Sequence, residues 1–206
     1  GQARSEAIRV YVRTNDDQYG PLRVGPSFPL IFREETGPFP SADHAHFGSD
    51  IVTLSYQPHR PEDVASEIAL LERMHSRWQL GVACLEKAVS MAPERKRPEG
   101  MRMLGLGEFI GRSVMTTIHT KRWWQLKEAL ARTACPVERH GILKRMLSLG
   151  EDEIANAAAT IPLVEADSRL GWEPSMEYMT DRPHLAWKIA KLRRVLDHEI
   201  TPLLRT

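Results

Sequence analysis

Two histidines and an aspartate lie close together in the stretch DHAHFG, residues 43–48. Imidazole and carboxylate groups bind metals and also act as general acids or bases. On a strand, His44 and His46 would point to the same side, whereas the same spacing on a loop is far less specific. No third and fourth ligand stands at a defined spacing, so we expect no metal and no cofactor here. We interpret these residues, with Asp43, as loop residues or as part of a pocket.

A second group of polar residues stands in NDDQYGPLRVGPSFPLIF, residues 15–32. Asp16, Tyr19 and Arg23 alternate with prolines and glycines, which restrict the backbone, and binding residues often lie on loops of this kind. These three residues are therefore candidate ligand-binding residues. The alternative is that the segment only wraps around the rest of the chain or docks on another domain.

A third group lies in EADSRLGWEPSM, residues 165–176, where a helical pattern ends. Gly171 suits the left-handed position that often follows a helix, and Trp172 could fold back on the last turn. A helix end does not require Asp167, Arg169 and Glu173, and Arg169 could pair with either acid. The stretch predicts a helix end, and these polar residues with Trp172 could also form one edge of a binding surface.

The motifs that identify common enzymes are missing. The chain has no P-loop, no dinucleotide fingerprint and no Gly-x-Ser-x-Gly. Glu72 and His75 have the Glu-x-x-His spacing of di-iron bundles, but a second copy of that motif is lacking. The pair of carboxylates that a glycosidase uses cannot be chosen among 27 acidic residues. The sequence therefore names no catalytic residue.

Composition excludes several classes of protein. The 206 residues carry 28 basic and 27 acidic side chains, a net charge of +1, which gives no reason to expect nucleic acid as the main partner. No run of apolar residues is long enough to span a membrane. The basic run PERKRPEG, residues 93–100, is interrupted by two prolines and is interpreted as a solvated loop. Cys84 and Cys135 could form one disulfide, so the redox compartment and the localisation stay open.

Four amphipathic patterns follow Pro61, each with apolar residues every three or four positions. The first begins at Pro61, the second runs from about Met101 to Thr133, the third opens at Pro136 and the fourth at Pro183. Acidic residues behind Pro61 suit a helix N-terminus.

These patterns predict a mainly α fold, in which residues 61–206 form an antiparallel four-helix bundle, because short connections favour neighbours of opposite direction. Gly150 and the run ANAAA, residues 155–159, should let a neighbouring helix approach closely.

Residues 1–60 have a different character. Residues 7–13 and 51–56 look extended, and the stretch between them is rich in proline and glycine. We predict an irregular, partly extended segment that packs on the bundle or on a domain upstream. The chain begins with Gly1 instead of methionine, which favours a piece of a longer polypeptide.

At DQYGPLRVGPSFPLIF, AHFG and EADSRLGWEPSM, the chain resembles the C-terminal helical region of large glycoside hydrolase-like proteins of gut bacteria. This resemblance implies a catalytic barrel upstream, carrying the general acid and base, and a secreted or cell-surface location. No catalytic residue is carried over by it. The chain itself would be a non-catalytic accessory domain that packs on the catalytic domain and completes a sugar site with Trp172, Tyr19 or His46.

Two alternatives belong to other classes. One is a small independent hydrolase with its site at residues 43–46, and the other is a helical module that dimerises through a helix face. A large exposed apolar patch on residues 1–60 would favour the accessory domain, because such patches mark missing partners.

Overall fold

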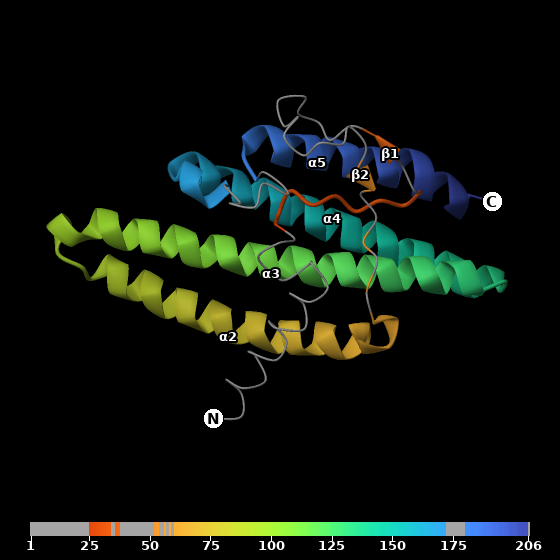
Figure 1. Ribbon diagram of the computed structural model, residues 1–206, viewed down its shortest axis with the longest axis horizontal. Coiled ribbons are helices and arrows are strands. Elements are labelled where there is room, and N and C mark those ends of the chain that lie inside the picture. Colours follow the sequence, from red (N-terminus) through yellow and green to blue (C-terminus); the bar gives the residue numbers. More distant parts are fainter. Residues whose placement is uncertain are drawn as a thin grey trace.

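The computed structural model describes residues 25–33, 36–37, 52–53, 56, 58, 60–171 and 180–205. Four long helices dominate it: α2 (Val64–Ser90), α3 (Arg97–Arg132), α4 (Pro136–Ala166) and α5 (Arg182–Arg194). Consecutive helices pack on each other in chain order, and their connections turn the chain back each time (Figure 1). The prediction of a mainly α, antiparallel helical bundle is confirmed.

Proline marks the start of each helix. Pro61 opens a 3-10 turn (Pro61–Asp63) that leads into α2, and Pro98, Pro136 and Pro183 stand in the first turns of α3, α4 and α5. A proline in the first turn loses nothing, because the N–H groups there have no partner inside the helix. Asp181 caps α5, since its side chain accepts the backbone N–H of His184.

The start of α3 corrects the sequence analysis. Residues 97–100 were expected in a loop, but α3 begins at Arg97 and includes them. Two prolines in one short run suggested a break, whereas only Pro93 lies outside the helices and Pro98 initiates the next one. The basic side chains of the run are exposed all the same.

Small elements complete the described part. β1 (Thr36–Gly37) and β2 (Val52–Thr53) pair antiparallel, with Thr36 opposite Thr53 and Gly37 opposite Val52. A 3-10 turn (Ser168–Gly171) follows α4. After α5 the chain continues as one turn of π-helix (Val195–Ile200) and a 3-10 turn (Thr201–Leu204).

The N-terminal strap, residues 25–33, runs across α4 from α5 towards α3 (Figure 1). It has no helix or strand, yet Leu30 and Ile31 are buried. Leu30 belongs to the largest apolar cluster, together with residues of α3, α4, α5 and the π-helical turn, among them Trp123, Met146, Leu192 and Leu196. The strap is therefore part of the core.

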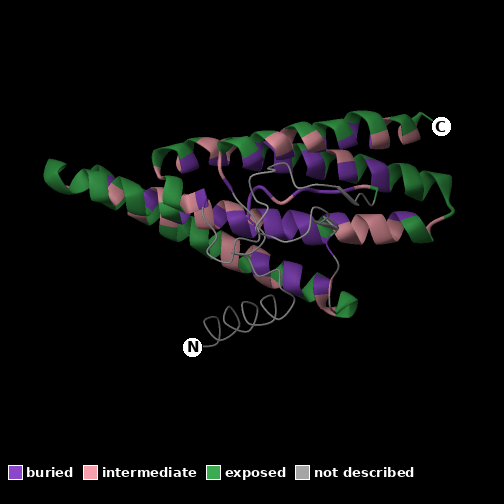
Figure 2. Cartoon of the chain, turned by 45° about the horizontal axis from the view of Figure 1, so that its top comes forward, coloured by how far each residue is buried: buried purple, intermediate pink, exposed green. Residues whose placement is uncertain are grey.

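A second apolar cluster joins α2 to α3 through Val64, Ile68, Leu71, Val114 and Ile118. All of its α2 members lie in the N-terminal part of that helix. Burial is concentrated in the middle of the molecule, and the far end of the α2–α3 hairpin is mostly exposed (Figure 2). Only the N-terminal part of α2 thus contributes to this cluster, and farther along the helix Val82 and Val89 face glycines of α3.

Two glycines are required by close packing. A Cβ on Gly150 would stand 2.5 Å from Cδ2 of Leu196, so the prediction that Gly150 lets a neighbour approach is confirmed. A Cβ on Gly171 would stand 2.5 Å from the carbonyl oxygen of Thr180. Gly171 does not take the left-handed conformation expected of it, and the contact with Thr180 accounts for the glycine instead.

Candidate functional site

Most residues that the sequence suggested for ligand binding lie outside the described residues: Asp16, Tyr19, Arg23, His44, His46, Trp172 and Glu173. Asp43 lies outside them as well, and with it the proposed hydrolase site at residues 43–46. The roles suggested for these residues stay predictions. Asp167 and Arg169 are described.

Asp167 and Arg169 form an ion pair directly after α4. Nε and Nη2 of Arg169 donate to the two carboxylate oxygens of Asp167 at 2.8 and 2.6 Å, and the backbone N–H of Arg169 donates to the same carboxylate at 3.2 Å. The side-chain hydrogen bond from Arg169 is the largest cause that lowers the pKa of Asp167 to about 2. The guanidinium is largely exposed, so the pair closes a surface turn and encloses no pocket.

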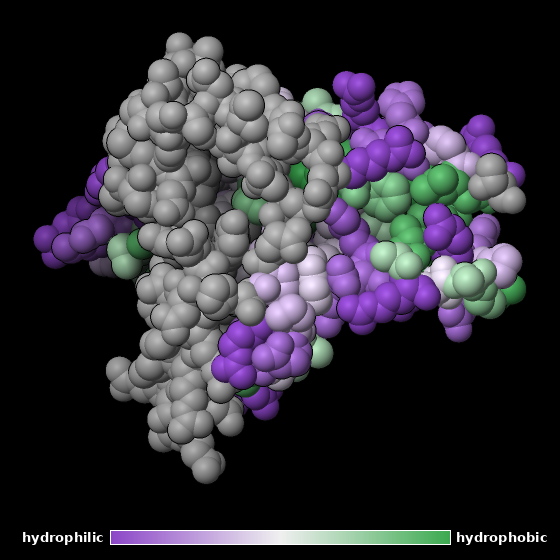
Figure 3. Space-filling model, turned by 45° about the vertical axis from the view of Figure 1, so that its right-hand side comes forward, coloured by the Kyte–Doolittle hydropathy of each residue, from purple (hydrophilic) through white to green (hydrophobic). Residues whose placement is uncertain are grey.

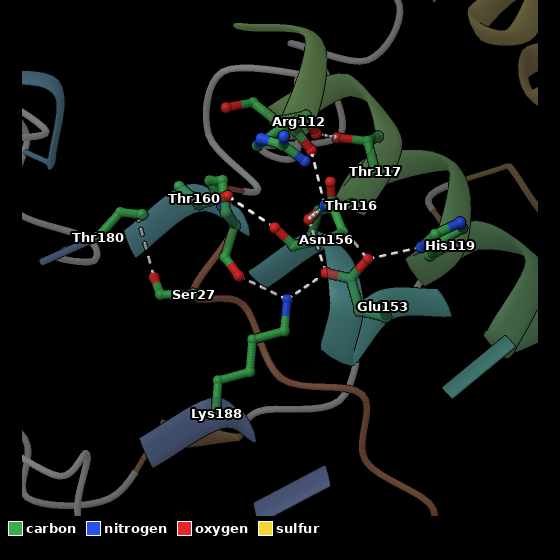
Figure 4. A network of polar contacts seen from close by, with 12 residues as sticks. Ser27, Arg112, Thr116, Thr117, His119, Glu153, Asn156, Thr160, Thr180 and Lys188 are labelled. Atoms are coloured by element: carbon green, nitrogen blue, oxygen red, sulfur yellow. Dashed lines mark hydrogen bonds and ion pairs between the residues drawn. The ribbon is translucent and has the colours of Figure 1, made fainter. Parts of the chain in front are cut away.

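A buried carboxylate, Glu153 of α4, is the centre of a polar network inside the bundle (Figure 4). Its Oε1 accepts hydrogen bonds from Thr116 of α3 at 2.6 Å and from the ammonium group of Lys188 of α5. Its Oε2 accepts the Nδ1–H of His119 of α3 at 2.6 Å. Glu153 and Lys188 both have an exposed fraction of 0%, so this ion pair joins α4 to α5 away from solvent.

The surroundings of Glu153 decide its charge. Burial on its own raises the pKa of a carboxyl, but the charge of Lys188, the hydrogen bond and charge of His119 and the hydrogen bond of Lys188 together outweigh burial. The pKa of Glu153 therefore lies below the ordinary 4.5, and the group is ionised at neutral pH.

Asn156 extends the network by one helical turn. Its Nδ2 donates to Thr116 Oγ1 at 3.0 Å and to the backbone oxygen of Arg112 at 3.1 Å. Thr160 in turn donates to the backbone oxygen of Asn156 at 2.9 Å. Each of these buried groups has a partner, which is the condition under which burial of polar groups is tolerated.

A second buried ion pair joins α3 to α2. Nζ of Lys121 donates to Oε2 of Glu67 at 2.9 Å and to the hydroxyl of Tyr56 at 2.7 Å, and it lies 5.0 Å from the centre of the Tyr56 ring. Tyr56 precedes the helices in the chain and is itself buried. The pair therefore also fixes a residue from outside the bundle.

The buried polar groups hold the strap in place. Lys188 donates to the backbone oxygen of Pro26 at 2.6 Å, and the indole N–H of Trp123 donates to that of Ile31 at 2.9 Å. The hydroxyls of Ser27 and Thr180 lie 3.2 Å apart (Figure 4). Every charged group in these networks is thus used to join segments of the chain.

A cleft of about 410 Å³ lies between α2 and α3, above Asn156 of α4. Its polar lining comprises His75, Gln79, Glu86, Glu108, Arg112 and Asn156. A Cβ on Gly111 would stand 2.8 Å from Nε2 of Gln79 and 3.3 Å from Cδ1 of Trp78. At Gly111, which lines the cleft, α3 therefore lies close against the side chains of α2.

Some polar side chains of this cleft have hydrogen-bond partners and others have none among the described residues. Burial, and then the charge of His119, lowers the pKa of His75 below the ordinary 6.5, so His75 is neutral at pH 7 and accepts a hydrogen bond from Gln79 at 3.1 Å. Within the part of the chain that the structure describes, the side chains of Glu86, Glu108 and Arg112 form no hydrogen bond or ion pair. Nε of Arg112 is in addition buried.

The far end of the α2–α3 hairpin exposes large apolar side chains. We call this surface the hairpin tip; it consists of Leu80, Met91, Met101, Met103 and Leu106, whose exposed fractions run from 39% for Leu106 to 71% for Met91. In Figure 1 the turn between α2 and α3 lies beyond the ends of α4 and α5. Residues 87–102 also carry five basic and two acidic side chains, whereas the whole chain is nearly balanced.

The opposite end of the molecule has a shallow groove of about 900 Å³ where α3 turns into α4. Apolar and hydrophilic residues are mixed at this end (Figure 3). The groove is lined by Arg132, Cys135 and Arg145 among others, and Val137 beside it is exposed. Cys135 and Cys84 are both free and exposed, so the disulfide that the sequence left open is absent.

Sequence reasoning missed the buried charges and the cleft. The signal for the charges was present, because Glu153 follows Gly150 by three residues and precedes Ala157 by four, and so lies on the stripe of α4 that faces its neighbours. Lys188 likewise lies between Leu185 and Leu192. The cleft gave no such signal, since it depends on which sides of α2 and α3 face each other.

No protein-family model, no characterised protein and no solved structure matches this chain. Among the described residues, no helix is long and apolar enough to cross a membrane. The same residues contain no group of three or more His, Cys, Asp or Glu side chains that could hold a metal ion.

Proposed function

We propose that this chain is a non-catalytic helical accessory domain of a larger carbohydrate-active polypeptide, and that it docks on a neighbouring domain through the hairpin tip. The observation that carries the docking part is the exposure of five large apolar side chains on one protruding hairpin. Several large exposed apolar side chains on one hairpin favour a contact surface there.

The residue types at the hairpin tip indicate what kind of partner surface would cover it. Methionine side chains are flexible and polarisable, and they adapt to irregular apolar surfaces. The basic side chains of Arg95, Lys96, Arg97 and Arg102 surround them and are exposed. A partner surface with an apolar centre and acidic groups at its edge would complement both features.

The inner polar groups support a structural role. The ion pairs of Glu153 with Lys188 and of Glu67 with Lys121 are buried and bind other parts of the chain. Groups fixed in this way build a rigid support. The link to carbohydrate rests on the resemblance at residues 17–32, 45–48 and 165–176, which implies a catalytic domain upstream.

The docking proposal is tested by amide hydrogen exchange. Exchange at residues 80–106 is measured in the isolated chain and in the complete polypeptide that the natural gene encodes. We expect exchange to be at least about tenfold slower in the complete polypeptide, because covered helices open less often. The double variant Met101→Glu and Met103→Glu should restore fast exchange, while residues 142–164 serve as an internal control that does not change. Equal rates at the tip, or a gene without a further domain, would contradict the proposal.

Its carbohydrate part is tested with a panel of nitrophenyl glycosides. The complete polypeptide should hydrolyse at least one of them, and the isolated chain should hydrolyse none. Hydrolysis by the isolated chain that is lost in His44→Ala or His46→Ala would favour the small independent hydrolase.

The exposed apolar residues also favour a second candidate, a module that dimerises through the tip. Sedimentation equilibrium of the isolated chain separates the two. Under the docking proposal the chain is a monomer, whereas a dimer that Met101→Glu dissociates would establish the second candidate.

A further inference from the structure

The cleft between α2 and α3 has the features of a binding site, and it is independent of the hairpin tip. Its volume of about 410 Å³ falls in the range of small-molecule sites, which are concave and hold a few convergent polar groups. The lining groups come from three helices, so their positions are fixed by the packing of the bundle. The buried Asn156 at its base is held by Thr116 and by the backbone of Arg112.

The cleft has hydrogen-bonding capacity that the described chain does not use. The guanidinium of Arg112 can donate up to five hydrogen bonds, and it makes none within the described residues even though its Nε is buried. Glu86 and Glu108 line the same cleft with carboxylates that accept none there. An unpaired buried donor is costly in a folded protein, so a ligand that satisfies it would bind favourably.

The balance of these groups selects the kind of ligand. Donors and acceptors stand side by side, which suits hydroxyl groups, because each hydroxyl both donates and accepts. Two carboxylates against one guanidinium, with His75 neutral, leave the cleft with a net negative charge. The two carboxylates disfavour phosphorylated and carboxylated ligands, and the guanidinium of Arg112 disfavours a ligand ammonium group.

An aromatic ring lies at the edge of the cleft. Trp78 is 37% exposed and lies against Gly111, which lines the cleft. Its indole N–H donates to the backbone oxygen of Gly107 at 2.6 Å, so the ring is held in one orientation. A fixed indole offers an apolar surface to the C–H groups of a bound ring.

We propose that the α2–α3 cleft binds a small neutral polyhydroxylated molecule of the size of one or two sugar rings. Arg112 donates to its hydroxyl oxygens, Glu86 and Glu108 accept its hydroxyl protons, and Trp78 contacts its apolar face. Gln79 contributes its amide oxygen and its second N–H, since His75 accepts only one N–H of the amide.

Saturation-transfer NMR on the 206-residue chain tests this site. The probes are glucose, galactose, mannose, xylose, N-acetylglucosamine, lactose and cellobiose at millimolar concentration, followed by calorimetric titration of the sugars that respond. Glucosamine, glucuronate and glucose 6-phosphate are the charged counterparts. We expect at least one neutral sugar to bind, and to bind more tightly than the anionic probes.

The decisive variant is Arg112→Met, which keeps an unbranched, flexible side chain and removes the donors. We expect the dissociation constant to rise at least about tenfold, as for the loss of hydrogen bonds from a charged group. Arg102→Met on the same helix lies outside the cleft and should leave the constant within about twofold. Circular dichroism shows whether Arg112→Met folds, and Glu108→Gln provides a second variant with the same expected direction.

Three results would overturn the proposal. They are the absence of saturation transfer to every neutral sugar, an unchanged dissociation constant in both Arg112→Met and Glu108→Gln, and tighter binding of glucosamine or of an anionic probe than of any neutral sugar.

Discussion

Glu153 has no access to solvent, and its carboxylate is shared by three partners from two other helices. A buried ion pair contributes little net stability compared with apolar residues, but removing one partner leaves the other as an isolated buried charge. The contribution of such a pair therefore appears when it is broken. The same reasoning applies to Lys121 and Glu67.

We expect Glu153→Gln to lower the free energy of unfolding by about 3–5 kcal/mol, because the amine of Lys188, whose pKa burial already lowers, then loses its counter-ion inside the core. Glutamine keeps the shape of the side chain, so packing changes little. Urea unfolding followed by circular dichroism measures the loss. The double variant Glu153→Leu with Lys188→Met removes both charges and should be more stable than Glu153→Gln. A loss under about 0.5 kcal/mol in the single variant would show that the pair is not isolated from water.

The same residue makes stability depend on pH. The pKa of Glu153 in the folded chain is lower than the ordinary 4.5 of an unfolded chain, so the unfolded state binds the proton more readily. The stabilisation is complete above pH 4.5 and is lost as the pH falls through the lower folded value. Unfolding free energies measured from pH 7 to pH 3 should fall less steeply in Glu153→Gln than in the natural chain. If the unfolding free energy falls equally steeply with pH in both proteins, the loss of stability in acid comes from other carboxylates, such as Asp167, whose pKa is about 2.

The helices themselves are joined by close contacts at small residues. Gly150 of α4 receives the side chain of Leu196, with no room for a further carbon atom. In contrast, nothing stands within 4 Å of a Cβ on Gly141 in the same helix. Gly150 and Gly141 therefore allow the same substitution to be compared at a crowded and at an open position of one helix.

We expect Gly150→Ala to reduce the free energy of unfolding by about 1–3 kcal/mol, because the added methyl group forces Leu196 out of its position. Gly141→Ala should increase it by roughly 0.5–1 kcal/mol, since alanine favours the helix and meets no neighbour. Thermal and urea unfolding of both variants give the comparison. If both substitutions stabilise the chain, α4 and the π-helical turn are packed less closely than described.

The helices were largely predictable from sequence because proline fixes the backbone angle that a helix start needs. Pro61, Pro136 and Pro183 marked three starts to within a few residues. The start of α3 was placed too late, because Pro98 was interpreted as a breaker although it stands in a first turn. Spacing places Glu153 and Lys188 on the stripes that face neighbouring helices, but charged residues are ordinarily assigned to the solvent side, so they were not recognised as core residues. The cleft depends on the rotation of α2 against α3, and no local pattern encodes that rotation.

At the scale of the whole molecule, stability is unevenly distributed. The middle of the bundle combines the apolar clusters, both buried ion pairs and the strap. The hairpin beyond residue 76 is mainly exposed, and its helices contact mostly each other (Figure 2). Regions with few buried contacts open at lower free-energy cost than the core.

Amide hydrogen exchange in the isolated chain should therefore show a gradient along α3. We expect residues 97–106 to exchange at least about a hundredfold faster than residues 113–123, which are mostly buried. Exchange followed by mass spectrometry resolves the two segments within one helix. Uniform protection along α3 would mean that the tip is as stable as the core, or that a second copy of the chain covers it.

The way the strap is held has a consequence for how its sequence can diverge. α5 and α3 bind the strap through the backbone oxygens of Pro26 and Ile31, which any amino acid would supply. Most strap residues are buried, and among them Ser27 and Leu30 make side-chain contacts with the bundle. Mutational scanning of residues 25–33, 123 and 188 should find substitutions tolerated at the exposed Arg33, whereas Lys188 and Trp123, which donate to the strap backbone, tolerate few. The exposed position of the strap can therefore change without altering the path of the strap across the helices.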